Sequence, residues 1–453
     1  MVRPVQDRIL LLHADYVGAT TNMSLHLGTV AKHPANPLFE EDRPWEQRLD
    51  NCYGNIVFDP DKGLYRCWYS PFIEAPSAKN KTLQERQQIP YEGYPKQEMA
   101  VCYAESSDGI TWHKPDLGLV EYAGSTANNL VMRGPHGAGV LDDPAATSAE
   151  QRYKAIYQGL HVRCSADGLQ WSPQQKINCD LAGDTHNNAL WVPDLNRYVA
   201  FTRDWRKTDR HIEGEESKTR HSWKRLVSRI ESSDFINWSQ SEVVIELEDW
   251  ELQPYSMAVF EYAGVYLGLL AIHDQISDRV WTELTFSADS VSWQRIDAGN
   301  ALIGCSDVEL DYDYGCVYAC AGPVVLDDEI RLYYGGSDYL HFGWRNGCLA
   351  LATLRPDGFA GYQPTDANEI GTLKTVVLAY AGEAIKVTAD IDAGGMLLVE
   401  VLDASTDAVL ALQQLGETAT DALALQAGAV EANAIKLRFS ARAAKVYSFV
   451  LEK

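Results

Sequence analysis

Short runs of alternating hydrophobic and polar residues, rich in β-branched and aromatic side chains, recur along the chain as far as residue 362. Alternation with a period of two predicts β-strands that have one buried face. The first four runs are close enough in sequence to form one antiparallel sheet: residues 55–59, 64–69, 99–104 and 118–122. Comparable groups follow between residues 139 and 353, which predicts five sheets of this kind.

A short motif of turn residues ends the third run of each group. Its first copy is Ser106-Ser-Asp-Gly-Ile-Thr-Trp112, and the motif returns at residues 165–171, 232–238 and 287–293, with a degenerate fifth copy at 357–362. Asp and Ser side chains can accept hydrogen bonds from backbone N–H groups two or three residues on, and Gly tolerates positive φ. Each copy therefore predicts a tight hairpin. One supersecondary unit recurring every 55 to 68 residues is typical of a propeller or a solenoid.

These repeats predict an all-β protein built from three parts. Residues 46–369 are predicted to form a five-bladed β-propeller, and residues 1–45 an irregular N-terminal strap. From residue 370 to 453 the chain is rich in Ala, Val and Leu, nearly free of aromatic residues, and alternates at 396–402 and 435–439. That segment predicts a small C-terminal β-sandwich.

Two long polar insertions interrupt the regular spacing, at residues 74–98 and 203–224. Both join the second and third strands of their sheets. Long loops in compact domains often have a functional role, and the shared position of these two predicts rims over one face of the propeller.

Charge and composition narrow the possible partners and location. The chain has 63 acidic and 39 basic residues and a net charge of -24, which argues against a nucleic-acid partner. No apolar run reaches the length of about 18 residues that a membrane span needs. The nine cysteines, scattered and without a CxxC pair, predict reduced thiols. Without a visible signal peptide, a cytoplasmic location is expected, although a trimmed signal for secretion or the periplasm would leave the same pattern.

In a propeller, the residues just before the innermost strands converge on a central funnel, where a ligand binds. Candidate catalytic residues at these places are Glu46, Asp50 and Asp184. Candidate substrate-binding residues there, or in the flanking loops, are Trp45, His136, His186, Arg203, Glu251, Tyr255, Tyr318 and His341. No spaced metal-binding pattern occurs, so neither a catalytic metal nor a cofactor is predicted; a structural cation in the channel stays open.

Carboxylates, imidazoles and aromatic rings around a funnel suit the hydrolysis of glycosidic bonds. One carboxyl must donate a proton to the leaving oxygen, while a second, ionised one activates water or attacks the anomeric carbon. Aromatic rings offer flat apolar faces to sugar C–H groups.

The repeated hairpin motif, with the run Tyr333-Tyr-Gly-Gly-Ser-Asp338, resembles the five-bladed β-propeller glycoside hydrolases of families 32, 43, 68 and 130 and their relatives. The resemblance implies acidic residues at the start of the first three inner strands, acting as base or nucleophile, modulator and acid. Asp50 matches the first place and Asp184 the third.

The second place departs from the pattern of these families. It is occupied by His136, and the nearest acids, Asp142 and Asp143, follow at the far end of the strand. The sequence signatures of the fructan-hydrolysing branch, Asn-Asp-Pro-Asn-Gly, Arg-Asp-Pro and Glu-Cys, are also absent. A fructosidase is therefore not expected, and the reaction stays open.

The leading hypothesis is an exo-acting glycosidase with an oligosaccharide substrate, with Asp50 as base or nucleophile and Asp184 as acid. A second hypothesis is a polysaccharide lyase acting on uronate-containing glycans, in which a His or Tyr removes the proton and Arg133 or Arg203 neutralises the carboxylate. A third is a non-catalytic carbohydrate-binding propeller, because fold alone does not establish activity. The oligomeric state stays open.

Overall fold

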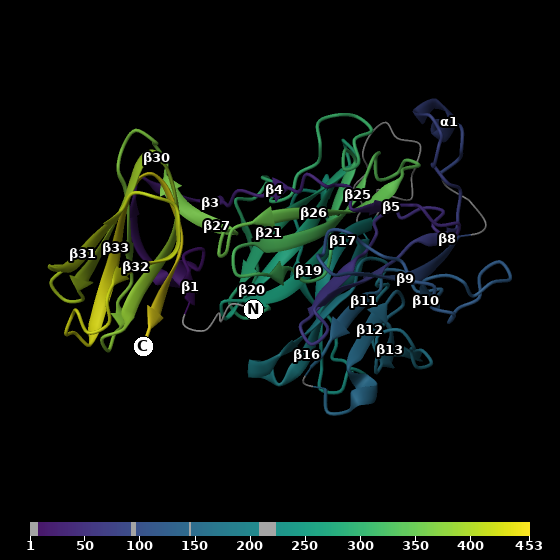
Figure 1. The fold of residues 1–453 in the computed structure, drawn as a ribbon, viewed down its shortest axis with the longest axis horizontal. Coiled ribbons are helices and arrows are strands. Elements are labelled where there is room, and N and C mark those ends of the chain that lie inside the picture. Colours follow the sequence, from purple (N-terminus) through teal and green to yellow (C-terminus); the bar gives the residue numbers. More distant parts are fainter. Residues whose placement is uncertain (1–7, 92–96, 145, 208–222) are drawn as a thin grey trace.

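The computed structural model describes residues 8–91, 97–144, 146–207 and 223–453. It is almost entirely β, as predicted. Figure 1 shows a larger body that contains β4 to β26 and a smaller one at the left built mainly of β27 to β33. The short helices of the described residues are α1 (Leu83–Gln87) and three turns of 3-10 helix, η1 (Ala14–Tyr16), η2 (Ala149–Gln151) and η3 (Pro193–Leu195).

Three antiparallel sheets follow one another in the larger body. The first consists of β6 (Asn55–Asp59), β7 (Leu64–Tyr69), β9 (Glu98–Ser106) and β10 (Leu130–Arg133), with β8 (Phe72–Glu74) also paired to β9. The second consists of β11 (Gly139–Asp142), β12 (Tyr153–Tyr157), β13 (His161–Ser165) and β14 (Gln175–Lys176). The third consists of β15 (Asn188–Val192), β16 (Arg197–Lys207), β17 (Trp223–Ser232) and β18 (Glu242–Ile245).

Two further antiparallel units are joined by a single parallel pair, Val280 with Cys316. One consists of β19 (Leu252–Tyr262), β20 (Val265–Asp274), β21 (Arg279–Ser287) and β22 (Gln294–Ile296). The other consists of β23 (Cys316–Ala319), β24 (Val324–Val325), β25 (Ile330–Ser337) and β26 (Gly347–Leu354). The N-terminal strands β4 (Ala31–Lys32) and β5 (Phe39–Glu40) pair with β26. This segment therefore completes the outer edge of the last unit.

The repeated motif forms the tight turns that its sequence predicts. In the first copy, the Asp108 carboxylate accepts hydrogen bonds from the backbone N–H groups of Ile110 (2.8 Å) and Thr111 (2.7 Å). The same pattern recurs at the other three copies, at Asp167, Asp234 and Asp289. These turns also link neighbouring sheets, because the Trp68 indole donates to the carbonyl of Gly168 at 2.7 Å.

The smaller body is a sheet in which two long strands take part in most of the pairing. Its strands are β27 (Ala360–Pro364), β28 (Gly371–Thr375), β29 (Leu378–Ala379), β30 (Ala384–Asp403), β31 (Val409–Leu415), β32 (Ala419–Leu425) and β33 (Ala434–Glu452). The N-terminal strands β1 (Arg8–Leu10), β2 (Val17–Thr21) and β3 (Met23–Leu27) pair with β33, β28 and β27. The register between β30 and β33 shifts between Ile391 and Met396, so the two strands bend around a separate apolar core.

Asp357 joins the two bodies. Its carboxylate is fully buried and accepts hydrogen bonds from the hydroxyls of Tyr262 and Ser448, each at 2.6 Å, and from the Arg8 guanidinium. Tyr262 ends β19, whereas Ser448 and Arg8 belong to β33 and β1. The fifth copy of the repeat thus supplies the polar connection between the two bodies.

We expect Asp357→Asn to destabilise the protein by about 2 kcal/mol, because a charged acceptor shared by three buried donors is lost. Asn keeps the shape of the side chain and tolerates the positive φ of this residue. The midpoint of urea unfolding measures the effect. Asp328→Asn, in an exposed turn, is the matched control and should leave the midpoint unchanged. Equal midpoints for both variants would contradict this role of Asp357.

Candidate active site

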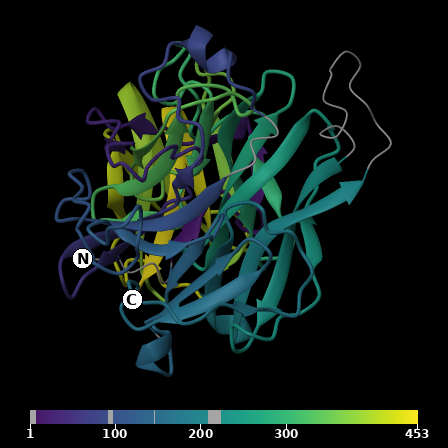
Figure 2. The ribbon, with the colours of Figure 1, turned by 90° about the vertical axis from the view of Figure 1, so that its right-hand side faces the viewer.

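The strands β16 and β17 carry four side chains toward one cavity. Residues two apart in a strand point to the same face. Arg203 and Trp205 are such a pair in β16, and Trp223 and Arg225 are another in β17; Trp205 lies opposite Arg225 in the register. Figure 2 shows these long strands reaching the grey trace of residues 208–222. That part of the predicted insertion lies outside the described residues.

The cavity has a volume of about 530 Å³, which is within the usual range for a small-molecule site. Its lining comes from several sheets: His136, Asp184, Arg203, Trp205, Trp223, Arg225, Tyr255, Gln275 and Phe342. Four of these residues, His136, Asp184, Arg203 and Tyr255, were predicted from the sequence. The other five were not, although the alternation of Arg and Trp at 203–205 and 223–225 was a usable signal.

Asp184 is the carboxylate that lines the cavity. Its Oδ1 accepts a hydrogen bond from the Trp205 indole at 3.0 Å, and its Oδ2 lies 3.5 Å from Nη1 of Arg203. Burial acts to raise the pKa of Asp184, but the Arg203 charge, the indole hydrogen bond and the Arg225 charge together hold that pKa below its ordinary value. Asp184 is therefore ionised at neutral pH when the cavity contains only water.

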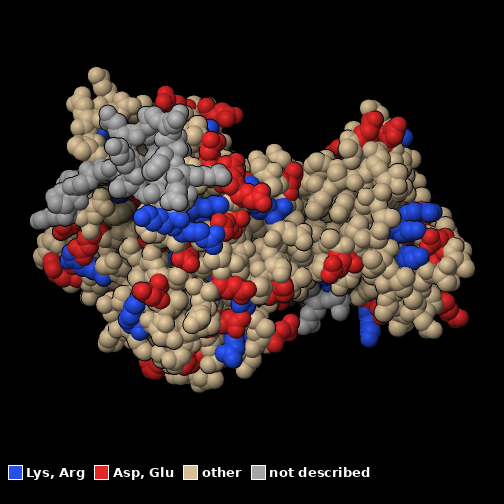
Figure 3. All heavy atoms as spheres, turned by 180° about the vertical axis from the view of Figure 1, so that it is seen from behind, with Lys and Arg blue, Asp and Glu red and all other residues tan. Residues whose placement is uncertain are grey.

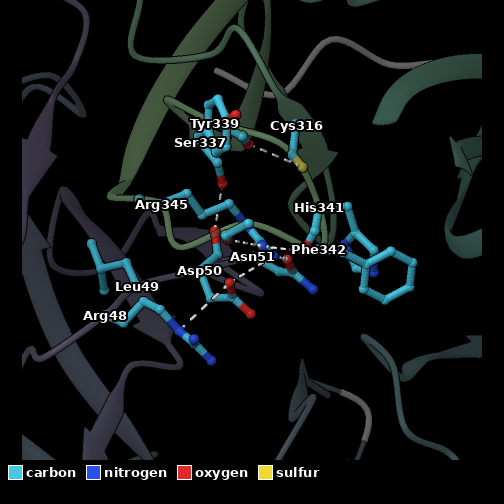
Figure 4. A network of polar contacts seen from close by, with 12 residues as sticks. Arg48, Leu49, Asp50, Asn51, Cys316, Ser337, Tyr339, His341, Phe342 and Arg345 are labelled. Atoms are coloured by element: carbon cyan, nitrogen blue, oxygen red, sulfur yellow. Dashed lines mark hydrogen bonds and ion pairs between the residues drawn. The ribbon is translucent and has the colours of Figure 1, made fainter. Parts of the chain in front are cut away.

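Asp50 is the second predicted carboxylate, and it is held by two arginines. Its Oδ1 lies 2.6 Å from Nη2 of Arg345 and 3.7 Å from Nε of Arg48 (Figure 4). Its backbone adopts a left-handed conformation, and its carbonyl accepts a hydrogen bond from the Ser337 hydroxyl at 2.8 Å. Asp50 does not line the cavity itself, but its side chain is 12% exposed.

His136 connects the two carboxylates electrostatically. Burial lowers the pKa of His136 to about 4, and both Asp184 and Asp50 oppose that shift. Both carboxylates therefore lie within electrostatic reach of the same imidazole, which is neutral at physiological pH.

Three other predicted residues are buried and do not line the cavity. The Tyr318 hydroxyl and Nδ1 of His341 are 2.9 Å apart, and both side chains are buried below Tyr255. His186 lies 3.1 Å from the amide oxygen of Asn55, and burial lowers its pKa to about 4. Tyr318 and His341 therefore pack against a residue of the cavity lining, whereas His186 contacts Asn55 and Tyr53.

The remaining predictions fall outside the cavity lining. The Glu46 side chain has no exposed surface, and its carboxylate is bound by Nζ of Lys114 (2.8 and 2.9 Å) and the Tyr69 hydroxyl (2.6 Å). This places Glu46 in a structural role, because a fully paired buried carboxylate has no access to a substrate. Trp45 is also buried, with its indole bonded to Asn129, whereas Glu251 is exposed.

Within the described parts of the chain, no group of three or more His, Cys, Asp or Glu side chains is arranged to hold a metal ion. No described helix is long and apolar enough to cross a membrane.

Comparison with known proteins places this fold. No protein-family model matches the chain, and no curated protein does. Among solved structures, it is similar to a β-1,2-mannobiose phosphorylase from Listeria innocua, with 12% identity, a TM-score of 0.50, and coverage of 72% of this chain and 97% of that one. It is also similar to a glycoside hydrolase family 43 arabinoxylan arabinofuranohydrolase from Bacillus subtilis, with 10% identity, a TM-score of 0.43, and coverage of 93% and 99%.

The predicted resemblance to propeller-type glycoside hydrolases is thereby confirmed at the level of the fold. At this sequence identity the likeness concerns the arrangement of the strands and not the reaction or the substrate.

The lowered pKa of Asp184 has a consequence for stability. A carboxyl whose pKa is lower in the folded state stabilises the fold above its unfolded-state pKa, near 3.8, and that contribution is lost as the pH falls through the lower folded-state value. We expect Asp184→Asn to be less stable than the wild type at neutral pH, and the difference to shrink toward about pH 3.

Thermal unfolding midpoints measured between these two pH values test this prediction. Asp180→Asn, an exposed residue of the same loop, serves as the control and should follow the wild type throughout. A stability difference that is independent of pH would show that Asp184 does not have a lowered pKa.

Proposed function

We propose that the five antiparallel units of the larger body are the blades of a five-bladed β-propeller and that the smaller body is its C-terminal β-sandwich. Contacts between the first and last units support closure of the ring. The backbone N–H of Ala321 bonds to the carbonyl of Gly54, and the Tyr333 hydroxyl bonds to the carbonyl of Gly109. The cavity then lies at one end of the central channel, where inner strands of different blades converge.

We propose further that the protein is an exo-acting glycoside hydrolase whose substrate is an oligosaccharide. The observation that carries this proposal is the cavity, in which a carboxylate lies among arginines and aromatic rings. Trp205, Trp223, Tyr255 and Phe342 offer apolar faces for sugar rings. The buried side chains beneath Tyr255 give the cavity a floor, which favours binding of the end of a glycan chain.

Asp50 and Asp184 can take the two carboxyl roles that hydrolysis requires. Asp50, paired with Arg345, is the candidate to activate water or attack the anomeric carbon. Asp184 has to be protonated to donate to the leaving oxygen. A sugar that fills the cavity removes water from Asp184, and burial already acts to raise its pKa. The bound substrate therefore shifts Asp184 toward the acid form that the reaction requires.

A lyase is the second candidate, because the ring of Tyr255 lies close to two guanidinium groups. The Cζ atoms of Arg203 and Arg225 lie 4.2 and 5.1 Å from the centre of that ring. In a lyase reaction the tyrosine would take the proton next to a substrate carboxylate that an arginine neutralises, while the C–O bond to the leaving sugar breaks and the leaving oxygen takes up a proton. A lyase product contains a new double bond and absorbs in the ultraviolet, whereas hydrolysis adds water without that absorbance.

We also propose that the protein acts in a reducing compartment and needs no cofactor. All nine cysteines are unpaired, which fits a reducing compartment such as the cytoplasm. The reaction proposed here uses only protein carboxylates and water, with no cofactor.

We expect Asp184→Asn and Asp50→Asn each to lower kcat by about 100-fold to 10,000-fold, because a positioned acid or base contributes a factor of this size. Purified protein is incubated with aryl glycosides and a set of oligosaccharides, and reducing-sugar release and ultraviolet absorbance are both recorded. Asp180→Asn is the control and should keep wild-type activity. Unchanged turnover in both test variants would refute the assigned roles. Absorbance without an accompanying hydrolytic product would favour the lyase, and glycan binding without turnover would favour a binding protein.

A further inference from the structure

The charge of the cavity is opposite in sign to that of the whole protein. The chain has a net charge of -24, and Figure 3 shows Asp and Glu side chains scattered over one face of both bodies. Among the described residues, the charged ones that line the cavity are Arg203, Arg225 and one carboxylate, Asp184. Because His136 is neutral, the part of the lining that the structure describes has one uncompensated positive charge.

Arg203 is the arginine whose charge and hydrogen-bond donors already have partners within the protein. Its Nη1 donates to the backbone carbonyl of Asp184 at 3.0 Å and lies 3.5 Å from that residue's carboxylate. Its Nη2 donates to the carbonyl of Tyr255 at 2.6 Å and to the Thr185 hydroxyl at 3.2 Å. Arg203 therefore has both a counter-ion and hydrogen-bond acceptors within the fold.

Arg225 has no such counter-ion among the described residues. Its side chain is buried, at 7% exposure, and lines the cavity; its Nε has no hydrogen-bond acceptor in the described structure. The side-chain contact within hydrogen-bond distance is Nη1 to Nδ1 of His273, at 3.4 Å. Burial, and then the Arg203 charge, lower the pKa of Arg225 to about 10, so this guanidinium is still protonated at neutral pH.

His273 cannot supply the missing negative charge. Its Nε2 lies 2.9 Å from Oδ1 of Asp278, and burial lowers its pKa to about 4. The neutral tautomer with a proton on Nε2 satisfies both contacts, because Nδ1 then accepts from Arg225. Asp278 is in turn engaged by this imidazole and by the backbone N–H of Phe342. The Arg225 charge is thus bonded on one side to a neutral group and faces the cavity on the other.

We propose that Arg225 binds an oxyanion of the substrate, and that this oxyanion is the carboxylate of an acidic sugar, a uronosyl residue. The inference rests on the proposed action on oligosaccharides and names the class of sugar. A planar carboxylate can accept two hydrogen bonds from one guanidinium, which gives a strong and directional contact. The neighbouring rings of Trp205 and Tyr255, each 5.1 Å from the Arg225 guanidinium, provide the apolar surface that a sugar ring requires. Free inorganic phosphate is the other oxyanion that this chemistry could bind.

Binding of matched sugars to the wild-type protein tests the proposal without any variant. The probes are methyl glucuronide with methyl glucoside, and methyl galacturonide with methyl galactoside. The members of each pair differ only by a carboxylate in place of a hydroxymethyl group. Quenching of tryptophan fluorescence reports binding, because Trp205 and Trp223 line the cavity. We expect at least one uronide to bind about 10-fold to 100-fold more tightly than its neutral partner, as a charged hydrogen bond would give.

Inorganic phosphate forms a separate arm of the experiment. Phosphate that binds while neither uronide is preferred would identify the oxyanion as free phosphate and overturn the proposal. Failure of both uronides to bind more tightly than their neutral partners overturns it as well. Phosphate that merely competes with a preferred uronide supports a shared oxyanion site.

Two variants then assign the preference to one residue. In Arg225→Gln the preference for the uronide should disappear while affinity for the neutral glycoside is retained, whereas Arg225→Lys should keep part of it. Arg197→Gln, an exposed arginine beside Glu231, is the control and should keep the full preference. Full preference in a folded Arg225→Gln protein would show that the carboxylate binds elsewhere.

The binding experiment separates this inference from the proposed reaction. Tighter binding of the uronides without any glycoside turnover would support the role of Arg225 and contradict the proposed hydrolase activity. Turnover with equal kcat/KM for acidic and neutral glycosides would support the hydrolase activity and contradict the role of Arg225.

Discussion

The buried guanidinium of Arg345 holds the floor of the cavity together. It is completely inaccessible to solvent and lies in the loop between β25 and β26. Its Nη2 lies 2.6 Å from the Asp50 carboxylate and donates to the amide oxygen of Asn51 at 3.0 Å (Figure 4). The Asn51 amide donates in turn to the hydroxyls of Tyr53 and Tyr255, at 2.7 and 3.2 Å. One charged group therefore joins loops of the first and fifth units, and through Asn51 the strand β19 of the fourth unit, at the point where the carboxylates must be positioned.

A buried arginine of this kind needs a partner that compensates its charge. The same pairing fixes the position of the Asp50 carboxylate, as a base or a nucleophile requires. Asp184 is different, because its contacts with Arg203 and Trp205 are at the edge of the cavity, and 29% of its side chain is exposed. Its protonation can respond to whatever fills the cavity. The two carboxylates are suited to different roles because Asp50 is paired with a buried arginine, whereas Asp184 is partly exposed.

The repeat and the alternation were sufficient to predict the all-β fold, the hairpins at Asp108 and its three equivalents, and the approach of His136, Asp184, Arg203 and Tyr255 to one place. These features depend on local sequence and on the symmetry of repeated units. Glu46 shows the limit of that reasoning: it stands near the start of an inner strand, but Lys114, far away in sequence, pairs with it and buries it. Arg225 was missed for a related reason: the pairing of β16 with β17 continues as far as Lys207 and Trp223, inside the segment that the sequence predicted to be an insertion.

The charge of a substrate and the protonation of Asp184 are linked through the two arginines. Both Arg203 and Arg225 act to lower the pKa of Asp184, against the effect of burial. An anion bound at Arg225 compensates part of that positive charge and excludes water at the same time, and each effect raises the pKa of the carboxyl. A neutral sugar supplies only the second effect. In the proposed enzyme an acidic sugar would therefore provide both the contact that binds it and the electrostatic change that prepares Asp184 to donate a proton.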